Sequence, residues 1–142
     1  MTMPAYDESY LDSMLQKTRY LFRIIARNSQ QAFDVIKAYM SSEYRENIDK
    51  GNPLYLNKTP KQILSSIGLN VDFNAEISDR YDEFILDWMA DIYTLLQWKF
   101  DLCSKDIVKE IPPEVLYKQY YPLHEASLEN AIRKLYDIYI IK

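Results

Sequence analysis

The chain has 142 residues, 48% hydrophobic and 27% charged, which are the proportions of one globular domain and not of a disordered chain. It contains one histidine, one cysteine and two glycines, so most familiar hydrolytic, metal-dependent and phosphate-loop sites lack the residues they need. The net charge of -4 disfavours nucleic acid and anionic lipid as partners, because both attract a surplus of lysine and arginine.

The charge is divided unequally along the chain. Residues 1–71 carry 9 basic and 7 acidic side chains, whereas residues 72–142 carry 8 and 14. Cys103 has no second cysteine to pair with, and the first twelve residues lack the basic and apolar segments of a signal peptide. No apolar stretch approaches the roughly 20 residues that cross a bilayer. We therefore expect a cytoplasmic protein that does not enter membranes.

Two helices are predicted in the first third of the chain. Apolar side chains recur with helical spacing over residues 7–28, which predicts a long first helix. Ser29 is a candidate cap for a second helix, which we expect to continue until Gly51 and the Asn52-Pro53 turn.

A short helix and a loop are predicted next. Thr59-Pro60-Lys61-Gln62 has the pattern of a capping box with proline at the first helical position, and Gly68 closes the helix. Residues 69–77 alternate too briefly to predict a strand. We expect a loop there that packs Val71 and Phe73 on the core.

The second half predicts a central helix followed by three shorter ones. Residues 78–100 give the strongest periodic signal in the sequence. Two short helices meet at Pro112-Pro113, the first capped by Ser104 and the second ending at Pro122, and a last helix begins near Ser127. The apolar residues assigned to the buried side of the central helix are Tyr81, Phe84, Ile85, Trp88, Ile92, Leu95 and Leu96. The whole chain is thus predicted to form one all-α domain, a bundle of six or seven helices.

Several of these anchors resemble those of a family of small bacterial all-helical proteins of unknown function. The matching residues are Lys50 to Tyr55, Trp88, Ile92-Tyr93, Gln97-Trp98, Ser104, Ile107, Ile111-Pro112-Pro113 and Tyr120 to Ala126. Proteins of this family are encoded beside small domains suspected of toxin and antitoxin roles. The resemblance implies a regulatory partner and assigns no catalytic residue; Ala90 stands where the family pattern has glycine.

An acidic stripe is predicted on the central helix, largely opposite its apolar side. Its carboxylates recur every four residues and are those of Asp79, Glu83, Asp87 and Asp91. A dinuclear metal site needs several inward-facing histidines and carboxylates, which one histidine cannot supply, so no metal is predicted. The structural interpretation is that these carboxylates form a solvated face of the helix. The functional interpretation is that Glu83, Asp87 and Asp91 bind a protein partner.

Three arginines repeat the same spacing on the first helix with the opposite charge. They are Arg19, Arg23 and Arg27. Stacked guanidinium groups bind phosphate or a row of carboxylates, which makes these arginines candidate anion-binding residues. The structural alternatives are a solvated face and an intramolecular match to the acidic helix.

Tyrosines gather in the last third of the chain, beside the single histidine. Tyrosine suits interfaces because it buries a large area at low cost in side-chain entropy. The candidate partner-binding residues there are Tyr117, Tyr120, Tyr121 and His124, with Tyr136 and Tyr139 nearby. The structural alternative places the tyrosines at the edge of the core and uses His124 to cap a helix or to hold Tyr120 or Tyr121.

These observations favour a non-enzymatic protein-interaction module whose partner is another protein or a second copy of the chain, with no cofactor. One alternative is a small enzyme or a nucleotide or phosphate binder that uses the arginine stripe with His124. The second is a DNA-binding regulator. Residues 104–120 have the outline of a helix-turn-helix, but the second helix offers Lys118 and Gln119 against Glu114, a poor set for reading DNA.

Overall fold

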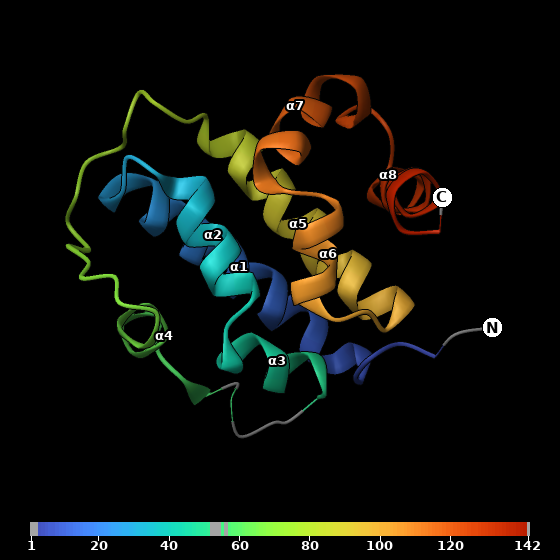
Figure 1. Ribbon diagram of the computed structural model, residues 1–142, viewed down its shortest axis with the longest axis horizontal. Helices are drawn as coiled ribbons and strands as arrows, with labels where there is room; N and C mark the ends of the chain where they lie inside the picture. Colours follow the sequence, from blue (N-terminus) through green and yellow to red (C-terminus); the bar gives the residue numbers. More distant parts are fainter. Residues whose placement is uncertain (1–2, 52–54, 56, 142) are drawn as a thin grey trace.

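The computed structural model describes residues 3–51, 55 and 57–141, and this part of the chain holds eight α-helices and no strand (Figure 1). The predicted all-α fold is therefore confirmed. The described residues form eight helices, where six or seven were predicted. The predicted Asn52-Pro53 turn lies outside the described residues.

The first predicted helix is confirmed as α1 (Leu11–Asn28), entered through a single 3-10 turn at Glu8–Tyr10. Asp7 begins this turn, because its carboxylate accepts a hydrogen bond of 2.9 Å from the backbone N–H of Ser9. The inward side of α1 carries Phe22, which meets the ring of Tyr93 edge-on. This contact joins α1 to the centre of the molecule.

The second predicted helix is two helices, α2 (Ala32–Met40) and α3 (Glu43–Asp49). The chain turns between them because Ser42 starts a new helix, its hydroxyl accepting from the backbone N–H of Arg45 at 3.2 Å. Ser29 is not the cap of α2, since its hydroxyl is used in a local turn before that helix.

The capping box predicted for the third segment is confirmed in α4 (Pro60–Ser66). The Gln62 side chain accepts from the backbone N–H of Thr59 at 2.9 Å, and the Thr59 hydroxyl accepts from that of Gln62 at 3.2 Å. Gly51 after α3 and Gly68 after α4 have φ of 75° and 83°, the left-handed backbone that only glycine adopts without strain.

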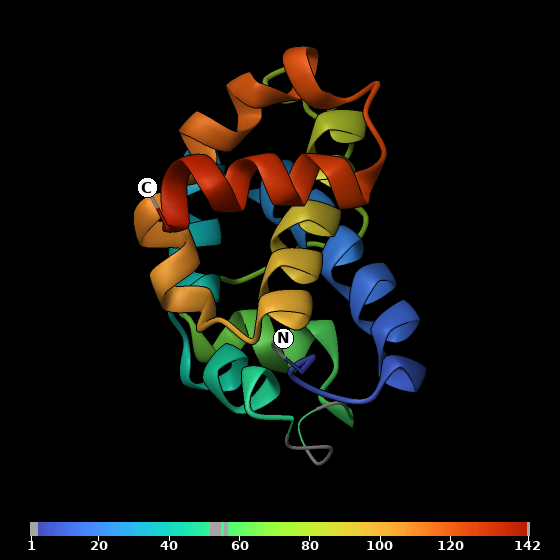
Figure 2. The same ribbon diagram turned by 90° about the vertical axis from the view of Figure 1, so that its right-hand side faces the viewer.

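Helix α5 (Glu83–Phe100) runs through the middle of the molecule, with α1 on one side and α6, α7 and α8 on others (Figures 1 and 2). It begins at the cap Asp82 and not at residue 78, because the Asp82 carboxylate accepts from the backbone N–H of Phe84 at 2.9 Å. Phe84, predicted to be buried, is 77% exposed. The surrounding helices instead bury residues around most of α5, among them Ile85, Leu86, Trp88, Met89, Ile92, Tyr93 and Leu96.

The two short helices that meet at the Pro-Pro step are α6 (Ser104–Glu110) and α7 (Pro113–Leu123). Ser104 is the first residue of α6 and not its cap, a position that Cys103 occupies. Pro122 does not end α7, because a proline in the last turn removes only one hydrogen bond and the helix continues to the next residue.

The last helix, α8 (Leu128–Leu135), begins at Ser127 as predicted and lies across α5 (Figure 2). A π-helical turn at Tyr136–Ile140 follows it. The predicted loop before α5 packs Val71 against the core, but Phe73 does not reach the core and stacks on the ring of Tyr20 near the surface. Within the described residues, every helix is too short or too polar to span a membrane.

Candidate functional site

The arginine stripe and the acidic stripe face each other across the contact between α1 and α5. Because the two helices are antiparallel, the arginine nearest the end of α1 meets the carboxylate at the start of α5, and each step of four residues adds another pair. The pairs are Arg27 with Glu83, Arg23 with Asp87 and Arg19 with Asp91. We call these six residues the ion-pair ladder.

Each pair of the ion-pair ladder is bidentate. Nε and Nη2 of Arg19 donate to the two carboxylate oxygens of Asp91 at 2.6 and 2.8 Å. The same two nitrogens of Arg27 donate to the two carboxylate oxygens of Glu83, both at 2.7 Å. Nε and Nη2 of Arg23 likewise donate to the two carboxylate oxygens of Asp87. The two parallel N–H donors of a guanidinium group match the two oxygens of a carboxylate, which makes arginine the side chain best suited to this pairing.

The ion-pair ladder lies at the edge of the helix contact, where the carboxylates are more buried than the arginines. Burial raises the pKa of Asp91, and the hydrogen bonds and charge of Arg19 oppose that rise. The hydrogen bonds to the carboxylates raise the pKa of each arginine above its ordinary value. Both predicted stripes thus find their counter-charges inside the chain, and an external partner would have to compete with them.

Asp79, the first carboxylate of the predicted stripe, precedes α5 and belongs to none of the three ion pairs of the ladder, although it lines the same groove as Arg23 and Glu83. This groove lies in front of the helix and is also lined by Arg80 and Asp82. The stripe expected from the sequence is therefore three carboxylates long on the helix itself.

A second charged cluster, which the sequence analysis did not find, is buried between α3 and α6. Arg45 has no exposed surface, and its Nε donates to the hydroxyl of Ser104 at 2.8 Å. The carboxylate of Asp49 lies 3.1 Å from Nε of Arg45 and accepts from Ser104 twice, from the backbone N–H at 2.6 Å and from the hydroxyl at 2.8 Å. We call Arg45, Asp49 and Ser104 the buried charge cluster.

The buried charge cluster is not fully hydrogen-bonded. Within residues 3–51, 55 and 57–141, both terminal nitrogens of Arg45 lack a hydrogen-bond partner, and so do the hydroxyls of Tyr6 and Tyr39. Burial raises the pKa of Asp49, which Arg45 opposes, and burial raises the pKa of Tyr6 to about 12. Asp49 is therefore the counter-ion that makes a charged arginine tolerable at this depth.

The predicted tyrosines of α7 divide into two that support the fold and one that faces solvent. The hydroxyl of Tyr117 accepts a hydrogen bond of 3.0 Å from the backbone N–H of Asp82, the residue that caps α5. Tyr120 packs edge-on against Trp88, with ring centres 5.5 Å apart. Tyr121 is 71% exposed.

His124 has the structural environment that the sequence analysis offered as the alternative to a functional one. Its ring stacks on Tyr120 with centres 4.6 Å apart. Its Nδ1 lies 3.0 Å from the carbonyl oxygen of Tyr120 and 3.1 Å from that of Tyr121. A carbonyl oxygen can only accept, so Nδ1 carries the proton and donates it to the end of α7.

An exposed apolar surface lies where α7 meets the start of α5. Ile77 and Phe84 are 65% and 77% exposed, and they line a groove of about 590 Å³ together with Tyr117. Tyr121 follows Tyr117 by one helical turn and continues the same side of α7. We call Ile77, Phe84, Tyr117 and Tyr121 the aromatic surface.

Cys103 and His124 do not form a catalytic pair in the described part of the chain. Burial raises the pKa of the Cys103 thiol, and neighbouring carboxylates led by Asp106 raise it further, which disfavours the reactive thiolate. Cys103 precedes α6, whereas His124 follows α7 and has its hydrogen-bond and ring contacts with Tyr120 and Tyr121 of that helix. In the described part of the chain, no three histidine, cysteine, aspartate or glutamate residues are grouped to hold a metal ion.

Comparisons with protein families, with curated proteins and with solved structures found no match to this chain. The resemblance drawn from the sequence motifs therefore stays a prediction.

Two features of the site could not be predicted from the sequence patterns. Arg45 and Asp49 have the four-residue spacing of an ordinary surface pair, and nothing near them indicates that Ser104 completes the cluster. Phe84 belongs to the periodic apolar set of α5, and only the placement of the neighbouring helices leaves it uncovered.

Proposed function

We propose that the protein is a non-enzymatic protein-binding module and that the aromatic surface contacts its partner. The observation that carries the proposal is the exposure of Phe84 and Tyr121, two large rings on adjoining helices, with Ile77 beside the first. Exposed apolar residues gathered in one place and rimmed by polar groups are typical of binding surfaces.

The charges around the aromatic surface favour a basic partner. The carboxylates of Asp79, Asp82 and Glu83 line the same groove. Of its two arginines, Arg23 is paired with Asp87, and the guanidinium of Arg80 donates to the carbonyl oxygen of Gln30 at 3.4 Å. The half of the chain that contains this surface is also the acidic half. The partner we favour is a different protein that presents apolar side chains flanked by lysine or arginine.

The ion-pair ladder takes a structural part in this proposal. Its carboxylates are held by arginines of the same chain, so Glu83, Asp87 and Asp91 position α5 and thereby Phe84. The finer proposal, which comes from the family resemblance, is that binding regulates a partner in a toxin and antitoxin setting.

Site-specific photo-crosslinking tests the proposal. p-Benzoylphenylalanine would replace Tyr121 in the full chain, and irradiation in the native cell should yield one dominant adduct with a basic protein. The same label at Tyr10, a partly exposed tyrosine in the N-terminal turn, is the control and should not give this adduct.

A matched pair of substitutions assigns the adduct to the aromatic surface. Phe84→Ser should abolish it, and Ile138→Ser, which changes another exposed apolar residue after α8, should leave it intact. Equal adducts from the labels at Tyr121 and Tyr10, or an adduct that survives Phe84→Ser, would refute the proposal. An adduct between two copies of the chain would refute the choice of a different, basic partner.

The alternatives have less support from the geometry. An enzyme or phosphate site built from Arg19, Arg23 and Arg27 with His124 requires free guanidinium groups beside the imidazole, but those groups bind α5 and His124 packs on α7. A DNA-binding regulator predicts salt-sensitive binding to duplex DNA, so a missing mobility shift at low salt would remove it.

A further inference from the structure

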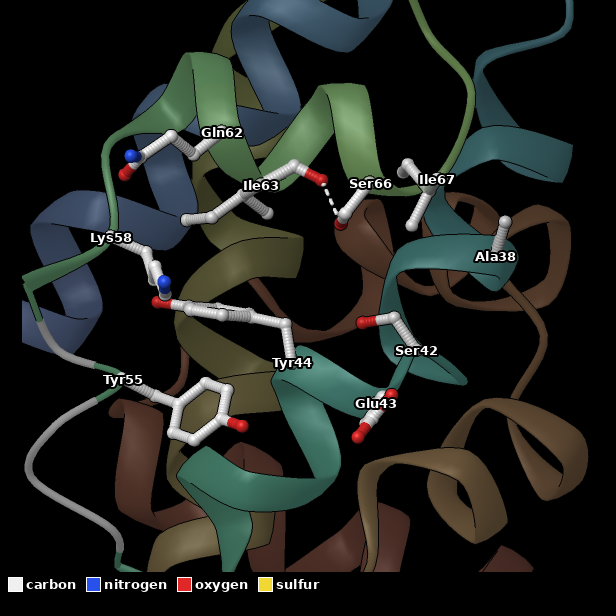
Figure 3. Close-up of a pocket in the computed structure, with 10 residues that line it drawn as sticks. All are labelled: Ala38, Ser42, Glu43, Tyr44, Tyr55, Lys58, Gln62, Ile63, Ser66 and Ile67. Atoms are coloured by element: carbon white, nitrogen blue, oxygen red, sulfur yellow. Dashed lines mark hydrogen bonds between the residues drawn. The ribbon is translucent and has the colours of Figure 1, made fainter.

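A groove of about 570 Å³ separates α4 from the end of α2 and the start of α3 (Figure 3). This volume is in the range of small-molecule sites. One wall is aliphatic, formed by Ala38, Ile63 and Ile67. The other side is aromatic, with the rings of Tyr44 and Tyr55 6.1 Å apart. A flat apolar body would therefore be held between side chains on both sides.

The hydroxyl of Tyr44 is an unused polar group in this groove. Tyr44 is 7% exposed, and its hydroxyl has no hydrogen-bond partner among the residues that the structure describes. Figure 3 shows its ring along the groove with the hydroxyl directed to the end where Lys58 lies. A buried hydroxyl without a partner is costly, and a ligand atom that accepts its proton would remove the cost.

Lys58 supplies a positive charge at the same end. Its side chain forms no ion pair with any residue in the described part of the chain, although its backbone carbonyl accepts from Lys17 at 3.2 Å. Glu43 lies at the other end of the groove (Figure 3), so the two ends differ in sign. A ligand that is negative at one end would therefore have a fixed orientation.

We propose that this groove binds a small organic carboxylate, with the carboxylate between the Lys58 ammonium and the Tyr44 hydroxyl and a flat apolar body between Tyr55 and the aliphatic wall. An ammonium and a phenol at one end supply two donors for the two carboxylate oxygens. The groove shares no lining residue with the one at the aromatic surface, so this inference does not depend on the proposed function.

Benzoate and benzamide are matched probes for this groove, since they share a ring and differ in charge. Titration of the full chain with benzoate at constant ionic strength should shift the backbone amide resonances of Ser42 and Ser66, which line the groove. Lys58→Gln should weaken benzoate binding at least about tenfold, and Tyr44→Phe about tenfold, because each removes one donor to a charged group. Benzamide should bind at least about tenfold more weakly than benzoate, because its neutral amide lacks the negative charge that the Lys58 ammonium would pair with.

Lys61→Gln is the matched control, because Lys61 is an exposed lysine of α4 that does not line the groove. It should leave the benzoate titration unchanged. Equal affinity for benzoate and benzamide, unchanged benzoate binding by Lys58→Gln, or the absence of shifts at Ser42 and Ser66 would overturn the proposal. Retained amide spectra of both variants would show that a loss of binding is not a loss of fold.

Discussion

The ion-pair ladder and the buried charge cluster use the same chemical groups at different depths. Arg19 and Arg23 of the ladder keep about two-fifths of their side-chain surface in solvent, and each arginine of the ladder is matched by a carboxylate with two hydrogen bonds. Arg45 is completely buried, and its two terminal nitrogens have no hydrogen-bond partner in the described part of the chain. Complete pairing is thus found at the surface, and incomplete pairing in the interior.

The difference shows that the geometry of an arginine–carboxylate pair does not by itself set its contribution to stability. At the edge of α1 and α5, the guanidinium groups of Arg19 and Arg23 are partly exposed, so water can replace part of the bonding that they lose. Between α3 and α6, loss of Asp49 leaves a charge that water cannot reach. The two regions should therefore respond very differently to the removal of one carboxylate.

The largest effect is expected from Asp49→Asn. This substitution leaves Arg45 charged and buried without a counter-ion, so the free energy of unfolding should fall by about 3–5 kcal/mol. Urea unfolding followed by circular dichroism measures the change.

Glu46→Gln is the control on the same helix. Glu46 pairs with Lys50 at 3.2 Å on the exposed side of α3, so the loss should stay below about 0.5 kcal/mol. Similar losses for Asp49→Asn and Glu46→Gln would break the comparison between buried and exposed pairs.

A smaller effect is expected from a single pair of the ion-pair ladder. A double-mutant cycle of Arg23→Gln and Asp87→Asn should give a coupling energy of about 1 kcal/mol, because the pair is bidentate but open to solvent. The coupling should shrink in 1 M salt, since screening acts on exposed charges.

Asp79 provides the reference for that cycle, because it shares the sequence spacing of the ladder but precedes α5. Arg23→Gln combined with Asp79→Asn should show coupling near zero. A coupling as large as that of Arg23 with Asp87 would mean that charge in general, and not the pairing, holds the two helices.

The smallest effect is expected from the exposed pair of Lys37 and Glu114, which joins α2 to α7 at 2.9 Å. Burial is the largest influence on the pKa of Glu114 and raises it, but the hydrogen bond and charge of Lys37 together with a backbone hydrogen bond outweigh burial and lower the pKa below its ordinary value. The stabilisation is therefore present above the unfolded-state pKa and is lost as the pH falls through the folded-state value.

Wild type and Glu114→Gln should accordingly differ by about 0.3 kcal/mol in unfolding free energy at pH 7, after allowance for solvent screening. The difference should close as the solution is acidified. A gap that widens toward low pH would contradict the direction of the pKa shift.

Local patterns predicted the helices well where the signal lies within a few residues. The capping box of Thr59 and Gln62, the start of the last helix near Ser127 and the proline start of α7 all depend on neighbours in the chain, and all are confirmed. Ser42 shows the limit of such patterns, because its sequence context did not reveal that it interrupts a longer helix.

Features that depend on distant residues were not predictable in the same way. Ser104 looks like a helix cap, but its bonds go to Asp49, which lies 55 positions earlier. The periodicity of α5 identifies apolar residues without showing how much of the helix its neighbours cover, so Phe84 was assigned to the core. The oppositely charged stripes on α1 and α5 left open that they pair with each other. That pairing depends on the antiparallel packing of the two helices, which the structure shows.

The central claim is that the ion-pair ladder serves the fold and the aromatic surface serves the partner. A charge swap at Arg19 and Asp91 separates the two roles, because neither residue lines the groove at the aromatic surface. The account predicts that Arg19→Glu or Asp91→Lys alone lowers the unfolding free energy. It also predicts that the double variant recovers most of the loss and still gives the Tyr121 photo-adduct. A double variant that is as stable as wild type but gives no adduct would contradict the claim and make the stripe itself the recognition surface.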